Sequence, residues 1–230
     1  MSKIAQNLEK VKKNIEKSLP RSMYSIEDIT LVAVAKNATL EQIKAINELG
    51  IKDIGENIVQ KLVPQMKSTK SLDINWHFVG HLQSNKVKYV IDKVHLIHSL
   101  ERYSLAGELN KRANFLGIEK VDSLVQVNIA LEETKYGLHP DEVFKFIEEV
   151  LKNYPKVKLK GLMAIAPYME QSEELRPYFF QMRSLFEKAR EEFSFSGDEF
   201  DTLSMGMSND YHIAIEEGSN MVRLGTILFK

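Results

Sequence analysis

The sequence predicts a single (β/α)8 barrel of parallel strands over residues 1–230, with one extra helix at the N-terminus. Short apolar runs alternate with amphipathic stretches along the whole chain, and strands separated by helices pair in parallel. The strand candidates number eight, which favours a closed barrel. No segment rich in Gly, Pro or Ser interrupts the series, so we expect one domain. A doubly wound open sheet is the alternative.

The first elements are indicated by their periodicity and by a capping signal. Apolar residues recur every three or four positions over 4–19, as on one face of an amphipathic helix. The valine-rich run LVAVA at 31–35 is the first strand candidate. Thr39 is followed three residues later by Gln42, which is the spacing of a capping box. The next helix should therefore begin near Thr39 and end at Gly50.

The same alternation continues to the end of the chain. Pro140 stands where the first turn of a helix is expected, a position that tolerates proline. The later strand candidates are 52–57, 76–80, 94–99, 122–129, 158–165, 199–205 and 220–226, and the helices between them are 57–67, 84–91, 101–116, 141–151, 172–193 and 208–217.

Composition excludes several classes of function. Lys plus Arg total 31 and Asp plus Glu total 32, and this balance argues against nucleic acid or an anionic membrane as the main partner. The absence of cysteine excludes disulfides, thiolate catalysis and cysteine-bound metals. Residues 1–19 are too charged for a signal peptide, and no apolar run approaches the ~20 residues of a membrane helix. We therefore expect a cytoplasmic protein without a membrane segment.

Lys36 is the strongest candidate for a chemically reactive residue. Functional groups of such barrels stand where strands end and loops begin, and the first strand candidate runs directly into this lysine. A lysine held among apolar neighbours is partly desolvated, which favours a nucleophilic amine able to form Schiff bases with carbonyl compounds. The alternative is a lysine whose stem covers apolar surface while its charge reaches water.

The segment LSMGMSND at 203–210 resembles an anion site at the start of a helix. Gly206 permits a tight turn, and Ser208 and Asn209 can cap the helix that follows. Free N–H groups and a hydroxyl at such a position bind anions. A capped turn without a ligand is the alternative.

The segment MVRLGT at 221–226 ends the last strand candidate. Arg223 and Gly225 share one face of the strand, Gly225 permits close approach of a ligand, and Thr226 adds a hydroxyl. Phosphate sites of such barrels often use the loops after strands seven and eight. Two suitable loops at these positions predict a phosphate site.

The remaining candidates give weaker evidence for a functional role. His77 and His81 stand four residues apart, but no carboxylate spacing completes a zinc motif, so we expect no metal. The aromatic stripe over 172–193 is expected to be core, and the lysine-rich first helix is expected to be a solvated face.

A lysine after strand one and a phosphate site after strands seven and eight together describe a pyridoxal phosphate (PLP) site. With these motifs the chain resembles the pyridoxal phosphate homeostasis protein family, also known as the YggS/PROSC family. The matching segments span nearly the whole chain in order: AVAK (33–36), GEN..Q (55–60), WHFVGHLQSNK (76–86), HS (98–99), QVN (126–128), KYGL (135–138), GLM.I.P (161–167) and LSMGMSNDY..AI..GS.MVR.GT (203–226).

The resemblance implies a fold and a set of site residues. The fold would be a single barrel like the N-terminal domain of bacterial alanine racemase. PLP would be held as an imine to Lys36, with Arg223 facing the pyridine nitrogen. The other implied contacts are Asn57 and His77 in the pocket wall and, at the phosphate, backbone N–H groups near Met207 together with Ser208, Gly225 and Thr226.

The resemblance also implies a function in intracellular vitamin B6 homeostasis. The protein would hold PLP as a Schiff base and buffer it or deliver it to PLP-dependent apoenzymes or to B6 salvage enzymes. An arginine can only donate to the pyridine nitrogen, so the ring becomes a poor electron sink and carbanion chemistry is handicapped. We therefore expect a non-catalytic carrier, and a monomer.

Two enzymatic alternatives remain open from the sequence. The first is an amino-acid racemase that uses the barrel alone, with a base such as Tyr136, His77 or His212. In alanine racemase that base is a tyrosine from an additional β domain of the partner subunit, and since only residues 227–230 follow the last strand, no such domain is expected here. The second is a Schiff-base aldolase without a cofactor, in which Arg223 and the phosphate site would hold a sugar phosphate.

Overall fold

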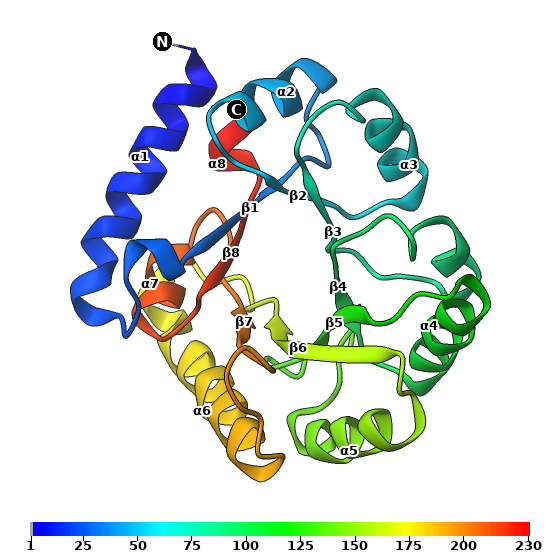
Figure 1. The fold of residues 1–230 in the computed structure, drawn as a ribbon. Helices are drawn as coiled ribbons and strands as arrows, with labels where there is room; N and C mark the ends of the chain where they lie inside the picture. Colours follow the sequence, from blue (N-terminus) through cyan, green and yellow to red (C-terminus); the bar gives the residue numbers. More distant parts are fainter. Residues whose placement is uncertain (1) are drawn as a thin grey trace.

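The computed structural model describes residues 2–230 and confirms the predicted (β/α)8 barrel. Eight parallel strands pair in sequence order, and β1 pairs with β8 to close the barrel (Figure 1). The strands are β1 Thr30–Val34, β2 Asp53–Glu56, β3 Asn75–Phe78, β4 Leu96–Leu100, β5 Val121–Val127, β6 Val157–Ala164, β7 Thr202–Ser204 and β8 Met221–Leu224.

Helices surround the strands, and the extra N-terminal helix is present. The α-helices are α1 Lys3–Ser18, α2 Leu40–Glu48, α3 Val59–Ser68, α4 Tyr103–Leu116, α5 Val143–Asn153, α6 Arg176–Glu192, α7 Tyr211–Glu216 and α8 Thr226–Phe229. The 3₁₀ helices are η1 Leu19–Arg21, η2 Ile26–Asp28, η3 Ser84–Tyr89, η4 Pro140–Glu142 and η5 Ser172–Leu175. Within residues 2–230, none of these helices has the length and apolar character needed to cross a membrane. A single domain over 1–230 stays a prediction.

The capping box predicted before α2 is confirmed. The Thr39 hydroxyl accepts from the N–H of Gln42 at 3.3 Å, and the Gln42 side chain accepts from the N–H of Thr39 at 2.9 Å. Gly50, with φ of 91°, follows the end of the helix. Both ends of this helix are therefore set by local chemistry that is visible in the sequence.

Three elements differ from the prediction. The helix expected at 84–91 is the 3₁₀ helix η3, in which only Val87 is buried, so no continuous apolar face supports an α-helix. The last strand ends at Leu224, and the short helix α8 starts at Thr226. The helix expected from 208 begins at Tyr211, because residues 205–210 form a loop at the barrel mouth.

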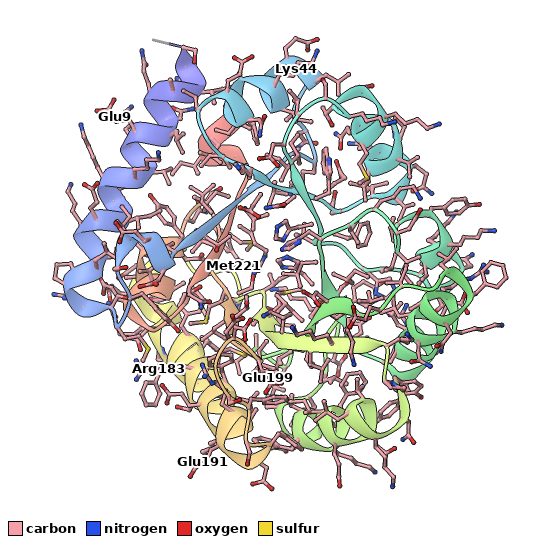
Figure 2. All side chains as sticks on the ribbon, viewed as in Figure 1. Glu9, Lys44, Arg183, Glu191, Glu199 and Met221 are labelled. Carbon is pink, nitrogen blue, oxygen red and sulfur yellow. The ribbon has the colours of Figure 1, made fainter. Side chains whose placement is uncertain are left out.

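The strands separate two layers of buried side chains. Inside the barrel, Val32, Leu96, Leu124, Met163 and Met221 form a compact apolar cluster. A larger core lies between the outer face of the strands and the helices. Figure 2 shows Met221 within the ring of strands, and Glu9 and Lys44 on the outward side of their helices. Alternate residues of each strand therefore serve different layers.

Helix α1 supports the part of the barrel that carries the last two loops. One face of α1 is buried, and the helix contacts α2, α7 and α8. Asn7 on this helix is buried, and its amide donates to the carbonyls of Leu228 at 3.1 Å and Lys230 at 2.9 Å. Asn14 donates to the hydroxyl of Tyr211 at 3.2 Å. The extra helix thus satisfies carbonyl groups at the end of α8 and anchors α7.

We predict that Asn7→Ala lowers the free energy of unfolding by about 1–2 kcal/mol, because it leaves two terminal carbonyls without their donor. Urea denaturation measures the change. The exposed Lys10 on the same helix provides the control, and Lys10→Ala should leave stability nearly unchanged. Equal stability of the two variants would contradict the anchoring role.

Candidate functional site

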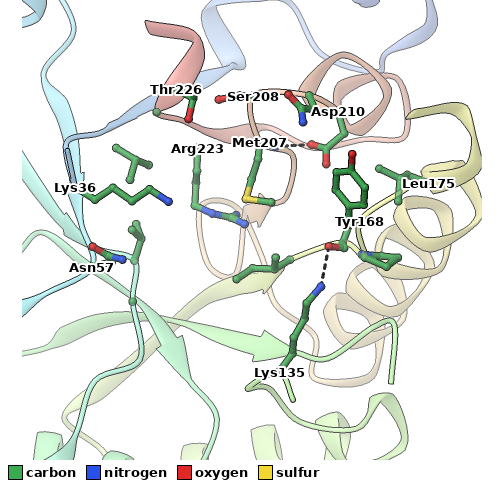
Figure 3. A pocket seen from close by; sticks show the side chains of 18 of the residues that line it. Lys36, Asn57, Lys135, Tyr168, Leu175, Met207, Ser208, Asp210, Arg223 and Thr226 are labelled. Atoms are coloured by element: carbon green, nitrogen blue, oxygen red, sulfur yellow. Dashed lines mark hydrogen bonds between the residues drawn. The ribbon is translucent and has the colours of Figure 1, made fainter. Parts of the chain in front are cut away.

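A pocket of about 730 Å³ opens at the carboxyl end of the barrel (Figure 3). Barrels of this kind carry their functional sites at this end. The pocket is lined by residues from the ends of several strands. They include seven of the eight residues expected around the cofactor: Lys36, Asn57, Met207, Ser208, Arg223, Gly225 and Thr226.

Lys36 lies two residues beyond the end of β1. Its carbonyl accepts from the ammonium of Lys61 at 2.7 Å, which fixes the backbone at this turn. Figure 3 shows the Lys36 side chain extended along the pocket toward Arg223. The lysine is exposed, which agrees with the alternative in which its charge reaches water. Two residues beyond the end of β1, it lies at the pocket mouth and outside the apolar interior of the barrel.

Asn57 is held at the end of β2 by its neighbours. The carboxylate of buried Glu56 accepts from the N–H of Asn57 at 2.6 Å and from that of Ile58 at 3.0 Å. A Cβ added to Gly80 would lie 2.2 Å from the carbonyl oxygen of Asn57, so only glycine fits beside it. The Oδ1 atom of Asn57 is buried and has no hydrogen-bond partner within residues 2–230. This acceptor at the pocket wall suits a donor supplied by a ligand.

The loops after β7 and β8 are joined to each other. The backbone N–H of Arg223 donates to the carbonyl of Gly206 at 3.0 Å, and the N–H of Ile227 donates to the Ser208 hydroxyl at 3.4 Å. Gly225 precedes α8, and a Cβ there would lie 3.2 Å from the carbonyl oxygen of Val34. Met207, Ser208, Gly225 and Thr226 of these two loops line the same pocket, and Ser208 and Thr226 carry hydroxyl groups of the kind that can bind a phosphate.

Asp210 is a pocket residue that the sequence analysis did not assign. Its carboxylate accepts from the N–H of Met207, and the side chain is 5% exposed. Burial raises the pKa of Asp210, while hydrogen bonding to Met207 and the charge of Arg223 oppose that rise. The position of Asp210 in the sequence could have indicated this hydrogen bond. The residue lies directly before a helix and three residues after Met207, and aspartates in turns often accept from nearby backbone N–H groups. Asp210 shapes the loop in which the phosphate contacts are expected.

Arg223 is buried at the pocket wall, and only part of the hydrogen-bonding capacity of its guanidinium is used within the protein. Its Nη1 donates to the Ser204 carbonyl at 2.9 Å and to the Ser204 hydroxyl at 2.7 Å, and its Nη2 donates to the Ala164 carbonyl at 2.8 Å. Within residues 2–230, Nε and the second Nη2 hydrogen have no protein acceptor, so they are available to a ligand. Desolvation lowers the pKa of Arg223 to about 10, and Asp210 opposes this effect. The guanidinium remains charged at neutral pH.

His77 does not line the pocket, and this corrects the prediction. Val79 is the residue of the same chain segment that reaches the pocket wall. Residues 77 and 79 share a face by the period of two, so His77 lies one layer deeper in the barrel. There it is 1% exposed and lies 3.0 Å from the carboxylate of Asp53 and 3.0 Å from the ring of His98. Strand periodicity gave the correct face and not the correct depth.

Two further lining residues are Tyr136, a candidate base of the racemase alternative, and Lys135. Tyr136 is 59% exposed and stacks on His81, with ring centroids 3.9 Å apart. Lys135 forms an ion pair with Glu132 at 2.7 Å and points into the pocket (Figure 3). Both belong to the KYGL segment, which the sequence analysis quoted without assigning Lys135 a function. Among residues 2–230, no group of three or more metal-ligating side chains comes together.

Comparison with known proteins places this site in a family. The family model for the alanine racemase N-terminal domain matches residues 2–230. A protein of Aquifex aeolicus named pyridoxal phosphate homeostasis protein is 42% identical over 224 residues, covering 97% of this chain and 96% of its own. A Helicobacter pylori protein of the same name is 36% identical and covers 98% of this chain and 97% of its own. The chain belongs to the pyridoxal phosphate homeostasis protein family.

Solved structures agree with this membership. PipY of Synechococcus elongatus PCC7942, solved with PLP bound, superposes with a TM-score of 0.84 at 28% identity. That match covers 99% of this chain and all of the PipY chain. Alanine racemase of Clostridium difficile 630 superposes with a TM-score of 0.73 at 17% identity, and the match covers 98% of this chain and 55% of the racemase chain. The latter similarity confirms the alanine racemase N-terminal fold of this family member.

We predict that Gly206→Ala destabilises the fold by about 2 kcal/mol or more. Gly206 has a φ of 94°, and an added Cβ would lie 2.7 Å from the Cβ of Ala214. Gly117 is the matched control, because its φ is 68° with nothing within 4 Å, so Gly117→Ala should cost only about 1 kcal/mol. Thermal unfolding of both variants checks the difference, and an equal loss would show that Gly206 has no steric constraint.

We predict that the protein loses stability as the pH falls below about 6.5, the ordinary pKa of histidine. Burial lowers the pKa of both His77 and His98 in the folded state. The unfolded chain then binds more protons than the folded chain, so stability falls by up to about 1.4 kcal/mol per pH unit for each ring. Urea titrations between pH 5 and pH 7 give the slope. His98→Asn should flatten it, whereas a change at exposed His139 should not.

Proposed function

We propose that this protein binds PLP at the carboxyl end of the barrel and acts in intracellular vitamin B6 homeostasis. The observation that carries the proposal is the convergence in one pocket of an amine, Lys36, a buried cation, Arg223, and two loops suited to phosphate. The names of the relatives and the PLP-bound structure of PipY support the same ligand. PLP has a matching set of groups: an aldehyde, a ring nitrogen and a phosphate.

Each group of PLP has a chemical counterpart in the pocket. We assign Lys36 to the aldehyde, with which a primary amine forms a reversible imine. Ser208, Gly225 and Thr226, with backbone N–H groups near Met207, would hold the phosphate. Arg223 would donate to the ring nitrogen through the N–H groups that have no protein acceptor within residues 2–230. Asn57 would contact the ligand from the wall, while His77 lies outside the pocket lining.

Arg223 favours storage over catalysis. The cofactor supplies an electron sink when its ring nitrogen is protonated, and an arginine cannot provide that proton. A pocket that binds the aldehyde without activating the ring is suited to buffering PLP or passing it on. We therefore propose a non-catalytic carrier that is cytoplasmic and monomeric. Its recipients would be PLP-dependent apoenzymes or enzymes of B6 salvage.

The covalent link is tested by absorbance and mapping. We predict that the protein supplied with PLP shows the absorbance band of a protonated imine and that Lys36→Ala removes it. Borohydride reduction followed by peptide mapping should place the adduct on Lys36. The variant Lys44→Ala, at an exposed position outside the pocket, should retain the band. An adduct on Lys135, the other lysine of the lining, would overturn the assignment to Lys36.

The carrier function is tested separately from binding. The PLP-loaded protein is incubated with single amino acids in deuterated water, and exchange of the α-proton is followed by NMR. We expect no exchange above the rate of free PLP, because the ring nitrogen facing Arg223 stays unprotonated. Exchange at the rate of an enzymatic turnover would contradict the carrier proposal and favour a racemase.

A further inference from the structure

A chain of hydrogen-bonded polar side chains crosses the interior of the barrel beneath the pocket. It starts at Arg223, whose guanidinium donates to the Ser204 hydroxyl at 2.7 Å. The Ser204 hydroxyl lies 3.5 Å from Nδ1 of His98, and Nε2 of His98 lies 3.0 Å from Nδ1 of His77. The chain ends where Nε2 of His77 meets the Asp53 carboxylate at 3.0 Å. We refer to these five residues as the polar column.

The polar column connects the pocket to the opposite end of the barrel. Arg223 lies near the carboxyl end of β8, whereas Asp53 is the first residue of β2 and therefore lies at the amino end. Ser204, His98 and His77 are fully or almost fully buried, whereas Asp53 is 26% exposed at one end and Arg223 lines the pocket at the other. A buried polar chain of this length needs every donor matched to an acceptor, because each unpaired group is costly.

The residues at the two ends of the polar column determine the donor-to-acceptor direction of its hydrogen bonds. An arginine can only donate hydrogen bonds and an aspartate carboxylate can only accept them. The Ser204 hydroxyl accepts from Arg223, so its own hydrogen is free to point to Nδ1 of His98. His98 must then carry its proton on Nε2 and donate to His77, and His77 must carry its proton on Nε2 and donate to Asp53. Each ring is neutral in one tautomer, and all donors point from Arg223 toward Asp53.

The surrounding charges agree with two neutral rings. Burial lowers the pKa of His98 well below its ordinary value, and the positive charge of Arg223 lowers it further. Burial also lowers the pKa of His77, although Asp53 opposes this effect. Partial burial acts to raise the pKa of Asp53, but hydrogen bonds from His77 and Asn75 outweigh it and the pKa is lowered. Asn75 supplies Asp53 with a second donor at 3.2 Å, which further favours the carboxylate.

We propose that the polar column positions the guanidinium of Arg223 and transmits the negative charge of Asp53 to the ligand site, so that an aspartate at the far end of the barrel adjusts the protonation of the imine between Lys36 and the bound cofactor. The effect on the cofactor rests on the proposed function, because that function supplies PLP as the ligand. The direction of the hydrogen bonds in the polar column rests on the geometry alone. Ser204, His98, His77 and Asp53 lie outside the pocket lining and act through Arg223 as positioning residues.

The direction of the column is tested without any ligand. Long-range ¹⁵N–¹H spectra of the histidine rings report which nitrogen carries the proton. We expect Nε2-protonated, neutral rings for both His77 and His98 at neutral pH, assigned with single His→Asn variants. A proton on Nδ1 of His98, or a charged His98, would reverse the chain and overturn the proposal.

The transmitted charge is tested with bound PLP. Asp53→Asn keeps an acceptor for His77 and removes the charge, so the field of Arg223 is less compensated and protonation at the cofactor is disfavoured. We expect the midpoint of the pH titration of the bound-PLP absorbance to fall by about half a pH unit. Asp73→Asn is the matched control, because exposed Asp73 lies just before β3 at the same end of the barrel, pairs with Lys52 and lies outside the column.

A double-variant experiment separates the column from interaction through space. In the Ser204→Ala background the hydroxyl link is absent, and the effect of Asp53→Asn should shrink to that of Asp73→Asn. A full shift in that background, or equal midpoints for Asp53→Asn and Asp73→Asn in the native background, would overturn the charge-transmission proposal. Failure of the wild-type protein to bind PLP would instead overturn the proposed function and leave the tautomer test intact.

Discussion

Closure of the barrel between β1 and β8 is the constraint on which the site depends. The register sets Val32 opposite Arg223 and Ala33 opposite Leu224. The end of β1, which leads into Lys36, therefore lies beside the end of β8, which leads into Gly225 and Thr226. In an open sheet with the same strand order the first and last strands would stand at opposite edges, and Lys36 and Thr226, about 190 residues apart in the chain, would not share one pocket.

The interior of the barrel combines an apolar cluster with a polar column, and the two have different physical roles. Val32, Leu96, Leu124, Met163 and Met221 fill space by close packing. The polar column occupies other interior positions with groups whose hydrogen bonds are matched in series, which offsets the cost of removing them from water. Its charged ends lie at the two mouths of the barrel and its neutral rings lie between, so a buried cation is retained under the pocket.

The strand pattern predicted the fold, and most of the residues expected at the site line one pocket. Lys36 and Arg223 could be located because a barrel presents the carboxyl ends of its strands at one mouth. Short segments such as MVRLGT show in the sequence where a strand ends. The same logic failed for His77, since periodicity gives the face of a side chain and not its depth. The exposure of Lys36 agrees with the alternative in which its charge reaches water, because the turn after β1 carries it beyond the apolar layer.

The polar column could not be predicted from the sequence. Its contacts join residues far apart in the chain, such as His98 and Ser204 at a separation of 106 positions, and no local motif marks them. Asp210 was missed for a different reason: its partner, the N–H of Met207, belongs to a loop whose conformation depends on the packing of Gly206. Long-range register and loop geometry are the two kinds of information that strand patterns lack.

The most direct measurement of the central claim is a crystal structure of the protein with PLP. The account predicts continuous electron density from Nζ of Lys36 to the aldehyde carbon, the phosphate between the loops that carry Ser208 and Thr226, and the guanidinium of Arg223 at the ring nitrogen. A ligand bound elsewhere, or a Lys36 side chain turned away from a phosphate seated in those loops, would contradict it.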